Sequence, residues 1–364
     1  MKAVVASRPD GLGTRLLTLL SGLRFAENLE ASFEIEWPSL CDSSYPLNGQ
    51  LLQSKDIADI FVAHQPIIGR NDVRFVTLSQ DKAVRRLNVH QEFGNINGRG
   101  FNRIAKMIDG YDYALYNTPE PVVFRGQSAA SEIEATKSNW LRINFAPDVV
   151  HSVNNFSHSF PLSDIVGVHV RRGDVVNILK YQTLEFLIAR GGTQIFQRYI
   201  PYQTIARILG SQFKHSNYIL VCTDSPEAAD ELQKFLPNHK VIQSTIAEAK
   251  NPNQRAIIDL ILLSRSSCLI SPFKSYFSTC AATVGRCKMI NAGLDIPSLV
   301  DELTALLETS DATHVSSRKS LIYTLGYLNL WNHPDSPMRN EMLRLAMDYD
   351  SEICRLLLDR SARK

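Results

Sequence analysis

The sequence predicts an α/β protein with two Rossmann-like domains followed by a helical C-terminal extension. The chain opens with a strand, a glycine turn and a helix, which together form the start of a β-α-β unit. Its second half repeats short apolar strands separated by helical segments. Beyond Leu299 no further strand pattern follows. A length of 364 residues suits two domains of ordinary size.

The domain boundaries follow from a polar segment near the middle of the chain. Residues 147–161 are rich in Ser, Asn and His, and we interpret them as an interdomain linker. The predicted domains are therefore 1–155 and 156–300, with the helical extension at 301–364.

Composition limits the partners and the compartment. With 39 basic against 37 acidic residues, nothing favours nucleic acid or a membrane surface as the main partner. No apolar run approaches the length of a membrane span. The six cysteines are scattered without a C-x-x-C pair, which favours a reducing compartment, so we expect a cytoplasmic protein. No zinc-ligand spacing occurs, and no metal is expected.

The N-terminal β-α-β unit contains a glycine turn that invites two interpretations. The strand Ala3–Ala6 is followed by Asp10–Gly13, a helix and a second strand, Phe33–Trp37. A dinucleotide site would use Glu36 for the ribose, but Leu16 replaces the third glycine of G-x-G-x-x-G. A more general interpretation is that backbone N–H groups at the helix start face an anion.

The central feature of the chain is Ile165–Asp174. An apolar run typical of a strand buried on both faces breaks into a loop that carries His169, Arg171, Arg172 and Asp174. Ligands of open α/β sheets lie beyond the carboxyl ends of strands, and guanidinium groups grip phosphate oxygens in pairs. We interpret this loop as a diphosphate site. The structural alternative is an ion pair between Arg171 and Asp174.

The segment after the arginine loop is the least regular part of the second half. Residues 175–192 mix helical and polar stretches and end in Arg-Gly-Gly, so they form either a lid over the anion site or a surface insertion. Residues 194–209 then show the spacing of one helix.

Two further strands end in polar loops that could complete the site. Tyr218–Cys222 runs into Thr223 and Asp224, and Cys268–Ile270 runs into a serine-rich loop before a helix at 279–284. Together with the glycine turn these loops describe a nucleotide-diphosphate site between two α/β domains. The glycine turn lacks the Gly-Lys-Ser/Thr of a P-loop, which argues against ATP hydrolysis.

Two helical regions carry less information about function. Arg255–Ser264 is almost wholly apolar apart from Asp259, a buried charge that needs a partner and that we interpret as structural. In the extension, 321–331 and 341–358 are amphipathic, and neither points to chemistry.

Several motifs resemble those of fucosyltransferases. The run His169–Asp174 resembles the H-x-R-R-G-D motif of α1,2-, α1,6- and protein O-fucosyltransferases. The spacing from Asp259 through Ser264 to Ser275–Ala282 is similar to the third motif of α1,2-fucosyltransferases. Asp10–Arg15 resembles their N-terminal glycine loop. The resemblance runs through both predicted domains in order, and the extension lies outside it.

This resemblance implies a GT-B-like fold, with two Rossmann-like domains facing a cleft, and a metal-independent, inverting transfer of L-fucose from GDP-fucose. Arg171 would hold the β-phosphate and stabilise the leaving GDP, and Arg172 would do the same or brace the loop. His169 and Asp224 would contact guanine. The resemblance assigns to catalysis Arg171, Arg172 and Asp174. It assigns to the donor Gly11, Gly13, Thr14, Arg15, His169, Arg171, Asp224, Ser275, Tyr276, Phe277 and Ser278.

The sequence leaves three different functions open beside fucose transfer. Thr14 stands where the family has asparagine, so a transferase that uses a dTDP- or UDP-deoxysugar would look much the same. An NAD-linked oxidoreductase and a nucleotide-sugar-binding protein without catalysis also stay open. Asp174, Glu36 and Asp10 are candidate general bases by position alone. The expected acceptor is a glycan or a lipid-linked oligosaccharide, in polysaccharide biosynthesis, and the oligomeric state is left undetermined.

Overall fold

The computed structural model describes residues 3–8, 11–37, 57–77, 86–89, 110–123, 127–273, 275–285, 287–293, 295–330 and 333–362. The chain divides into two compact units. The first comprises residues 1–163, 244–269 and 276–288, and the second comprises 164–243, 270–275 and 289–364. The domain boundaries given above stay a prediction.

The first unit contains a five-stranded sheet in the order β3-β2-β1-β5-β4. Every neighbouring pair in it is parallel. The strands are β1 (Ala3–Ser7), β2 (Ser32–Glu36), β3 (Arg74–Val76), β4 (Arg86–Asn88) and β5 (Tyr113–Tyr116). All five residues of β1 are buried, as expected for a central strand covered on both faces.

Helix α1 (Leu12–Asn28) connects β1 to β2 and is buried along most of its length. Leu16, Leu20 and Leu23 recur at helical spacing and are fully buried. Within this unit α1 packs against β1, α5 and α13. The other helices of the unit are α2 (Ile57–Ile60), α5 (Ala129–Trp140), α6 (Pro147–Ser159), α12 (Pro252–Arg265) and α13 (Tyr276–Val284).

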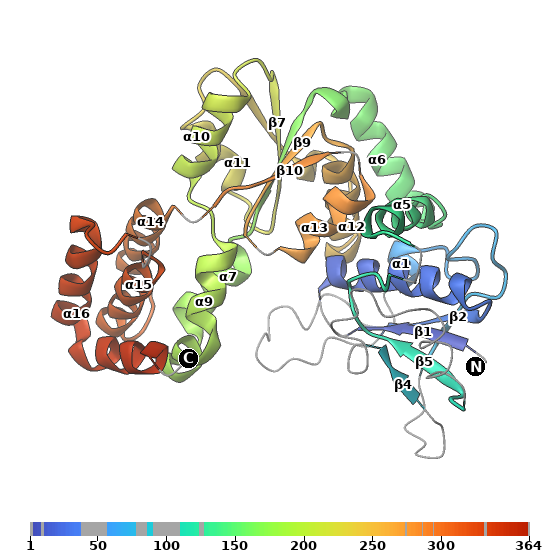
Figure 1. Ribbon diagram of the computed structural model, residues 1–364. Coiled ribbons are helices and arrows are strands. Elements are labelled where there is room, and N and C mark those ends of the chain that lie inside the picture. Colours follow the sequence, from blue (N-terminus) through green and yellow to red (C-terminus); the bar gives the residue numbers. More distant parts are fainter. Residues whose placement is uncertain are drawn as a thin grey trace. The chain divides into compact units, whose positions relative to one another are not determined.

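The prediction of a linker at 147–161 is wrong, because most of this segment is helix α6 (Figure 1). Proline occupies the first turn, where its missing N–H costs nothing. Val149, Val153 and Phe156 recur every three or four residues and are buried. The Ser, Asn and His residues that suggested a linker alternate with this buried stripe, as is usual for an amphipathic surface helix.

The second sheet has the order β10-β9-β6-β7-β8. Strand β6 pairs in parallel with β7, and β7 pairs in parallel with β8. The strands are β6 (Val166–Val170), β7 (Tyr218–Thr223), β8 (Lys240–Gln243), β9 (Cys268–Ser271) and β10 (Lys288–Asn291). From β6 the chain adds strands on one side as far as β8 and then returns to place β9 on the other side. The order therefore reverses between β6 and β9.

The helices of the second unit follow the arginine loop and the sheet. They are α7 (Gly173–Tyr181), α8 (Leu184–Phe186), a π-helical turn (Leu187–Gly191), α9 (Gly192–Arg198), α10 (Tyr202–Gln212), α11 (Ala228–Gln233), α14 (Ile296–Glu308), α15 (Val315–Asn329) and α16 (Pro337–Ala362). The single helix predicted at 194–209 is wrong. The chain forms α9 and α10 instead, and they are separated at Pro201, whose ring cannot continue a helix.

The predicted helical extension is confirmed as α14, α15 and α16, which pack on one another in the second unit, with α15 also against α9 (Figure 1). A Cβ atom on Gly326 would lie 2.8 Å from both Met342 Sδ and Val300 Cγ2, so glycine permits this three-helix contact. The predicted α/β class with two sheets is confirmed. The cleft between the domains stays a prediction.

Candidate functional site

The strand order of the second sheet marks a place where ligands bind. In doubly wound sheets a ligand lies beyond the carboxyl ends of the strands where the strand order reverses. Here the reversal falls between β6 and β9. Arg171 directly follows β6, and residues 271–275 follow β9. The arginine loop and the serine loop predicted from the sequence therefore leave the two strands that flank this point.

A contact links these two loops within the second unit. Ser275 Oγ lies 3.4 Å from Nδ1 of His169, and both residues are buried. His169 is the fourth residue of β6, and Arg171, two residues further on, is half-buried. The structure thus brings together two of the predicted donor-binding residues, His169 and Ser275.

Asp224 fixes the start of the helix that follows the arginines. Its Oδ1 accepts hydrogen bonds from the backbone N–H groups of Arg172, at 2.8 Å, and Gly173, at 2.9 Å. These N–H groups lie at the first turn of α7, where no helical carbonyl is available to them. A carboxylate at this place also complements the helix dipole. The guanine contact assigned to Asp224 stays a prediction.

Arg172 is buried, and the structure explains where its charge is balanced. Its Nη1 lies 2.6 Å from Glu302 Oε1 and also donates to Tyr199 Oη, while Nη2 donates to the carbonyl of Ile200 at 3.0 Å. The guanidinium lies 4.3 Å from the ring centre of Tyr199 and 3.5 Å from that of Tyr202. These contacts correspond to the bracing alternative for Arg172.

Burial and neighbouring charges shift the pKa of Arg172 in opposite directions. Desolvation alone would lower the pKa of Arg172, but Tyr199 and Glu302 outweigh it, and its pKa is raised. Burial raises the pKa of Tyr202 to about 12, so its hydroxyl stays protonated. Tyr199 Oη donates to Glu302 Oε1 at 2.9 Å. The cluster is therefore a fixed, charged support for the start of α7.

The far end of α7 is held by the helical extension. Arg318, on α15, is buried and donates from Nη1 to the carbonyl of Leu179 at 2.6 Å and from Nη2 to that of Gln182 at 2.9 Å. Its Nε donates to the carbonyl of Thr313 at 2.6 Å. The last carbonyls of a helix have no helical partner, and a cation there also suits the helix dipole. Glu302 and Arg318 thus tie both ends of α7 to the extension.

The segment 175–192, interpreted from the sequence as either a lid or a surface insertion, is helical and attached to the extension. Tyr181 donates to Asp311 Oδ1 at 3.0 Å. Arg360, on α16, donates to the carbonyls of Ile188 and Ala189 at 3.3 and 3.2 Å. These contacts attach the segment to the extension, and the two alternatives stay predictions.

In the first unit, the predicted glycine-loop residues form the start of α1. Gly11 is its N-cap and is exposed, with no atom within 4 Å of a Cβ built on it. A Cβ on Gly13 would lie 2.5 Å from both Phe277 Cα and Tyr276 O. Gly13 therefore allows α1 to meet the backbone of α13. Thr14 and Arg15 are buried in the first turn of α1.

Tyr276, Phe277 and Ser278 form the first turn of α13, three residues earlier than the helix start predicted at 279. Tyr276 is 45% exposed, and its hydroxyl donates to Glu120 Oε1 at 3.1 Å within the same unit. Ser278 is fully buried. Of the three, Tyr276 has the most exposed side chain, and Phe277 is half-buried.

The remaining residues predicted from the sequence lie in different surroundings. Asp10 and the side chain of Asp174 lie outside the described residues. Glu36 accepts a hydrogen bond from Ser7 Oγ across the β1–β2 pair. Asp259 is buried, with its Oδ1 3.8 Å from Nη1 of Arg255. In the described ranges no three His, Cys, Asp or Glu side chains are placed to hold a metal ion.

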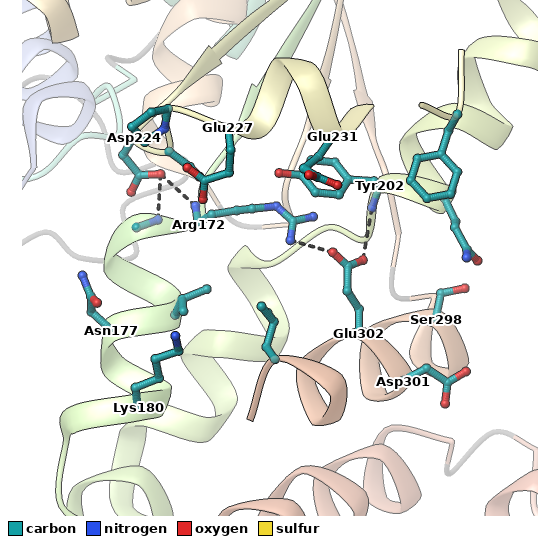
Figure 2. Close-up of a pocket in the computed structure, with 17 residues that line it drawn as sticks. Arg172, Asn177, Lys180, Tyr202, Asp224, Glu227, Glu231, Ser298, Asp301 and Glu302 are labelled. Carbon is teal, nitrogen blue, oxygen red and sulfur yellow. Dashed lines mark hydrogen bonds and ion pairs between the residues drawn. The ribbon is translucent and has the colours of Figure 1, made fainter. Parts of the chain in front are cut away.

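A cavity with a volume of about 730 Å³ adjoins the start of α7 (Figure 2). Arg172, Gly173 and Asp224 line one part of it, and Glu302 and Asp301 of α14 line another. Sequence reasoning missed this cavity and the residues on α14. Glu302 lies 130 residues beyond Arg172, and no local spacing connects the two.

The chain was compared with known proteins at three levels. No family model matches it, and no curated protein does. Among solved structures it is similar to the fucosyltransferase NodZ from Bradyrhizobium, with 17% identity, a TM-score of 0.47, and coverage of 78% of this chain and 93% of that one. It is also similar to POFUT1 in complex with GDP, with 14% identity, a TM-score of 0.44, and coverage of 79% and 96%.

A NodZ alpha-1,6-fucosyltransferase soaked with GDP-fucose gives similar values, with 17% identity and a TM-score of 0.46 over 78% of this chain and 92% of that one. All these TM-scores lie below 0.5, so the likeness carries no argument about this chain. Within the described residues, no helix is both long and apolar enough to cross a membrane.

Proposed function

We propose that this protein is a glycosyltransferase that transfers L-fucose from GDP-fucose to a hydroxyl group of a glycan. The observation that carries the proposal is the place of Arg171. It follows β6 at the point where the strand order of the second sheet reverses, and the serine loop follows β9 on the other side. The motif around Arg171 resembles that of fucosyltransferases, which supports GDP-fucose as the donor.

In the proposed reaction the acceptor oxygen attacks C1 of fucose as the bond from C1 to the β-phosphate oxygen breaks, with inversion at C1. Negative charge builds up on the leaving GDP, and a fixed guanidinium at the phosphate stabilises it. We assign this role to Arg171. Arg172 acts through its contacts with Glu302 and Tyr199, which hold the loop in place.

The other assignments are extensions of this proposal. His169 and Asp224 contact guanine, Ser275 and Tyr276 meet the phosphates and sugar, and the transfer needs no metal. The acceptor proton passes to a carboxylate or to the leaving phosphate, with Asp174 the candidate beside Arg171. The described cysteines are buried and the sequence contains no C-x-x-C pair, which supports a reducing, cytoplasmic location.

Calorimetric titration without added metal tests the proposal. We expect GDP and GDP-fucose to bind in preference to UDP- and dTDP-sugars and NAD. Arg171→Ala should weaken GDP binding by about tenfold or more and abolish transfer, because a charge-assisted bidentate pair with phosphate is lost.

The matched control is Arg344→Ala. Arg344 is an exposed arginine that forms ion pairs with Glu341 and Asp348 of its own helix, so its loss should leave GDP binding unchanged. Near-normal transfer by Arg171→Ala would refute the role assigned to Arg171. A preference for UDP or dTDP would move the donor to another deoxysugar, and preference for NAD would refute transferase function. GDP-fucose binding without transfer to any acceptor would identify a binding protein.

A further inference from the structure

The cavity beside α7 has the features of a binding site distinct from the phosphate position. Its lining comes from α7, α10, α14 and the loop between β7 and α11, all in the second unit. Its volume of about 730 Å³ lies within the range of about 300–1,000 Å³ found for ligand pockets. Arg171, the proposed phosphate ligand, does not line it. Figure 2 shows acidic side chains from two sides facing the space.

The charge balance of the cavity is strongly negative. The guanidinium of Arg172 is already compensated by Glu302 at 2.6 Å. Asp224 accepts hydrogen bonds from the backbone N–H groups of Arg172 and Gly173 and is the residue assigned to guanine, so it is not counted here. Lys180 is then the one remaining basic side chain in the lining, against Glu227, Glu231 and Asp301. A hydrogen bond from Ser225 lowers the pKa of Glu227, which therefore stays ionised. Diphosphate groups would be repelled here, and cationic groups would be attracted.

The remaining lining groups suit a sugar. Asn177, Gln203 and Ser298 supply both hydrogen-bond donors and acceptors. Phe235 also lines the cavity, is 43% exposed and supplies an apolar ring. Carboxylates accept hydrogen bonds from hydroxyl and ammonium groups, and an aromatic ring covers the C–H face of a pyranose. This mixture fits a carbohydrate that carries positive charge.

We propose that this cavity binds the acceptor glycan and selects one with free amino groups. The inference rests on the proposed transferase function, because an acceptor requires a transfer reaction. Glu227 and Asp301 lie on opposite walls, from the β7–α11 loop and from α14, and both are exposed. They form ion pairs with the ammonium groups of the glycan and so act as specificity-determining residues.

The test uses two tetrasaccharides that differ only at carbon 2. A β1,4-linked glucosamine tetramer carries free amines, and the β1,4-linked glucose tetramer carries hydroxyls in their place. Titrated at low salt into the 364-residue chain saturated with GDP, the glucosamine tetramer should bind about tenfold more tightly. Added salt should reduce this preference, because the ion pairs are partly exposed.

Three variants locate the effect. Glu227→Gln and Asp301→Asn should each weaken binding of the glucosamine tetramer by about fivefold and leave the glucose tetramer unchanged. GDP affinity should stay as in the unmodified protein. Glu352→Gln removes an exposed carboxylate of α16 that does not line the cavity, so it should change neither affinity.

The inference is overturned by equal binding of the two tetramers, or by a preference that survives both substitutions. It is also overturned if GDP competes with the tetramer, since the cavity would then hold the nucleotide. These results are separate from those for the donor. Loss of GDP binding in Arg171→Ala supports the transferase proposal whatever the tetramers do. Near-normal transfer in that variant refutes the role assigned to Arg171 even where the cavity selects amines.

Discussion

Two adjacent arginines illustrate how position within a loop separates similar side chains. Arg171 is half-buried at the end of β6, whereas Arg172 is buried and bound to Glu302 and Tyr199. Breaking a buried ion pair leaves an uncompensated charge, which is strongly destabilising. A substitution at Arg172 would therefore reduce activity through the fold of the loop. For this reason Arg171, rather than the pair, is the residue on which the donor test depends.

The structure explains the glycine at position 13 by helix packing rather than by ligand binding. A Cβ there would lie 2.5 Å from the backbone of Tyr276 and Phe277, so one helix must shift. We expect Gly13→Ala to lower the free energy of unfolding by about 1–3 kcal/mol, as measured by urea denaturation.

The control is Gly11→Ser, two residues earlier. Gly11 has open space around it and a backbone conformation that serine adopts readily, and serine is a preferred N-cap residue. This variant should be as stable as the unmodified chain or slightly more stable. If Gly13→Ala proved equally stable, the close contact between α1 and α13 would not exist in solution.

At the scale of elements, α7 is central to the candidate site because it starts at the arginine loop. Asp224 and the Arg172–Glu302 pair hold its first turn, and Arg318 holds its last. Such contacts at both ends suppress local opening. The extension therefore contributes to the precision of the loop although it carries no motif of its own.

Arg318→Met tests the contribution of the extension. Methionine fills much of the buried volume but leaves the carbonyls of Thr313, Leu179 and Gln182 without their donor. The free energy of unfolding should fall by about 3 kcal/mol, and amide hydrogen exchange in α7 should accelerate. Arg344→Met, at an exposed position of α16, should change neither measurement. Unaltered exchange in α7 would show that the helix holds its place without the extension.

For the whole molecule, periodicity predicted strands β1, β2, β6, β7 and β9, and loop position predicted that the loops after β6 and β9 lie at one edge of the second sheet. The buried run before Arg171 and the apolar run before Ser275 define β6 and β9, and a parallel sheet then places both loops at one edge. Long-range partners could not be predicted in this way. Glu302 and Arg318 meet α7 from 130 and 139 residues away, and single-sequence patterns carry only local information.

The prediction of a linker at 147–161 was wrong for a related reason. Its polar composition masked a buried stripe at Val149, Val153 and Phe156, which only a count at helical spacing would reveal. Composition responds to the exposed face of a helix, whereas periodicity responds to the buried one. In this segment the average polarity predicted a linker wrongly, whereas the spacing of its apolar residues indicates the helix that the structure shows.

The buried carboxyl of Asp259 makes the stability of the whole protein depend on pH. It was interpreted from the sequence as structural, and it lies in α12 with Arg255 as a distant partner at 3.8 Å. Burial raises the pKa of Asp259 to about 7, although Ser244 and Arg255 oppose the shift. In the unfolded chain the same carboxyl titrates near its ordinary pKa of 3.8.

The folded protein therefore binds more protons than the unfolded chain between about pH 4 and 7, and in this window the contribution of Asp259 to stability falls as the pH rises. Asp259→Asn cannot ionise and lacks this dependence. We expect the free energy of unfolding of the unmodified protein, relative to that of Asp259→Asn, to fall by roughly 4 kcal/mol across the window and to level off above it. Urea denaturation of both proteins at several pH values measures the difference. A constant difference from pH 4 to 8 would mean that Asp259 ionises normally and that α12 admits water or a closer cation, whereas the expected slope would show that it is a neutral, structural carboxyl at low pH.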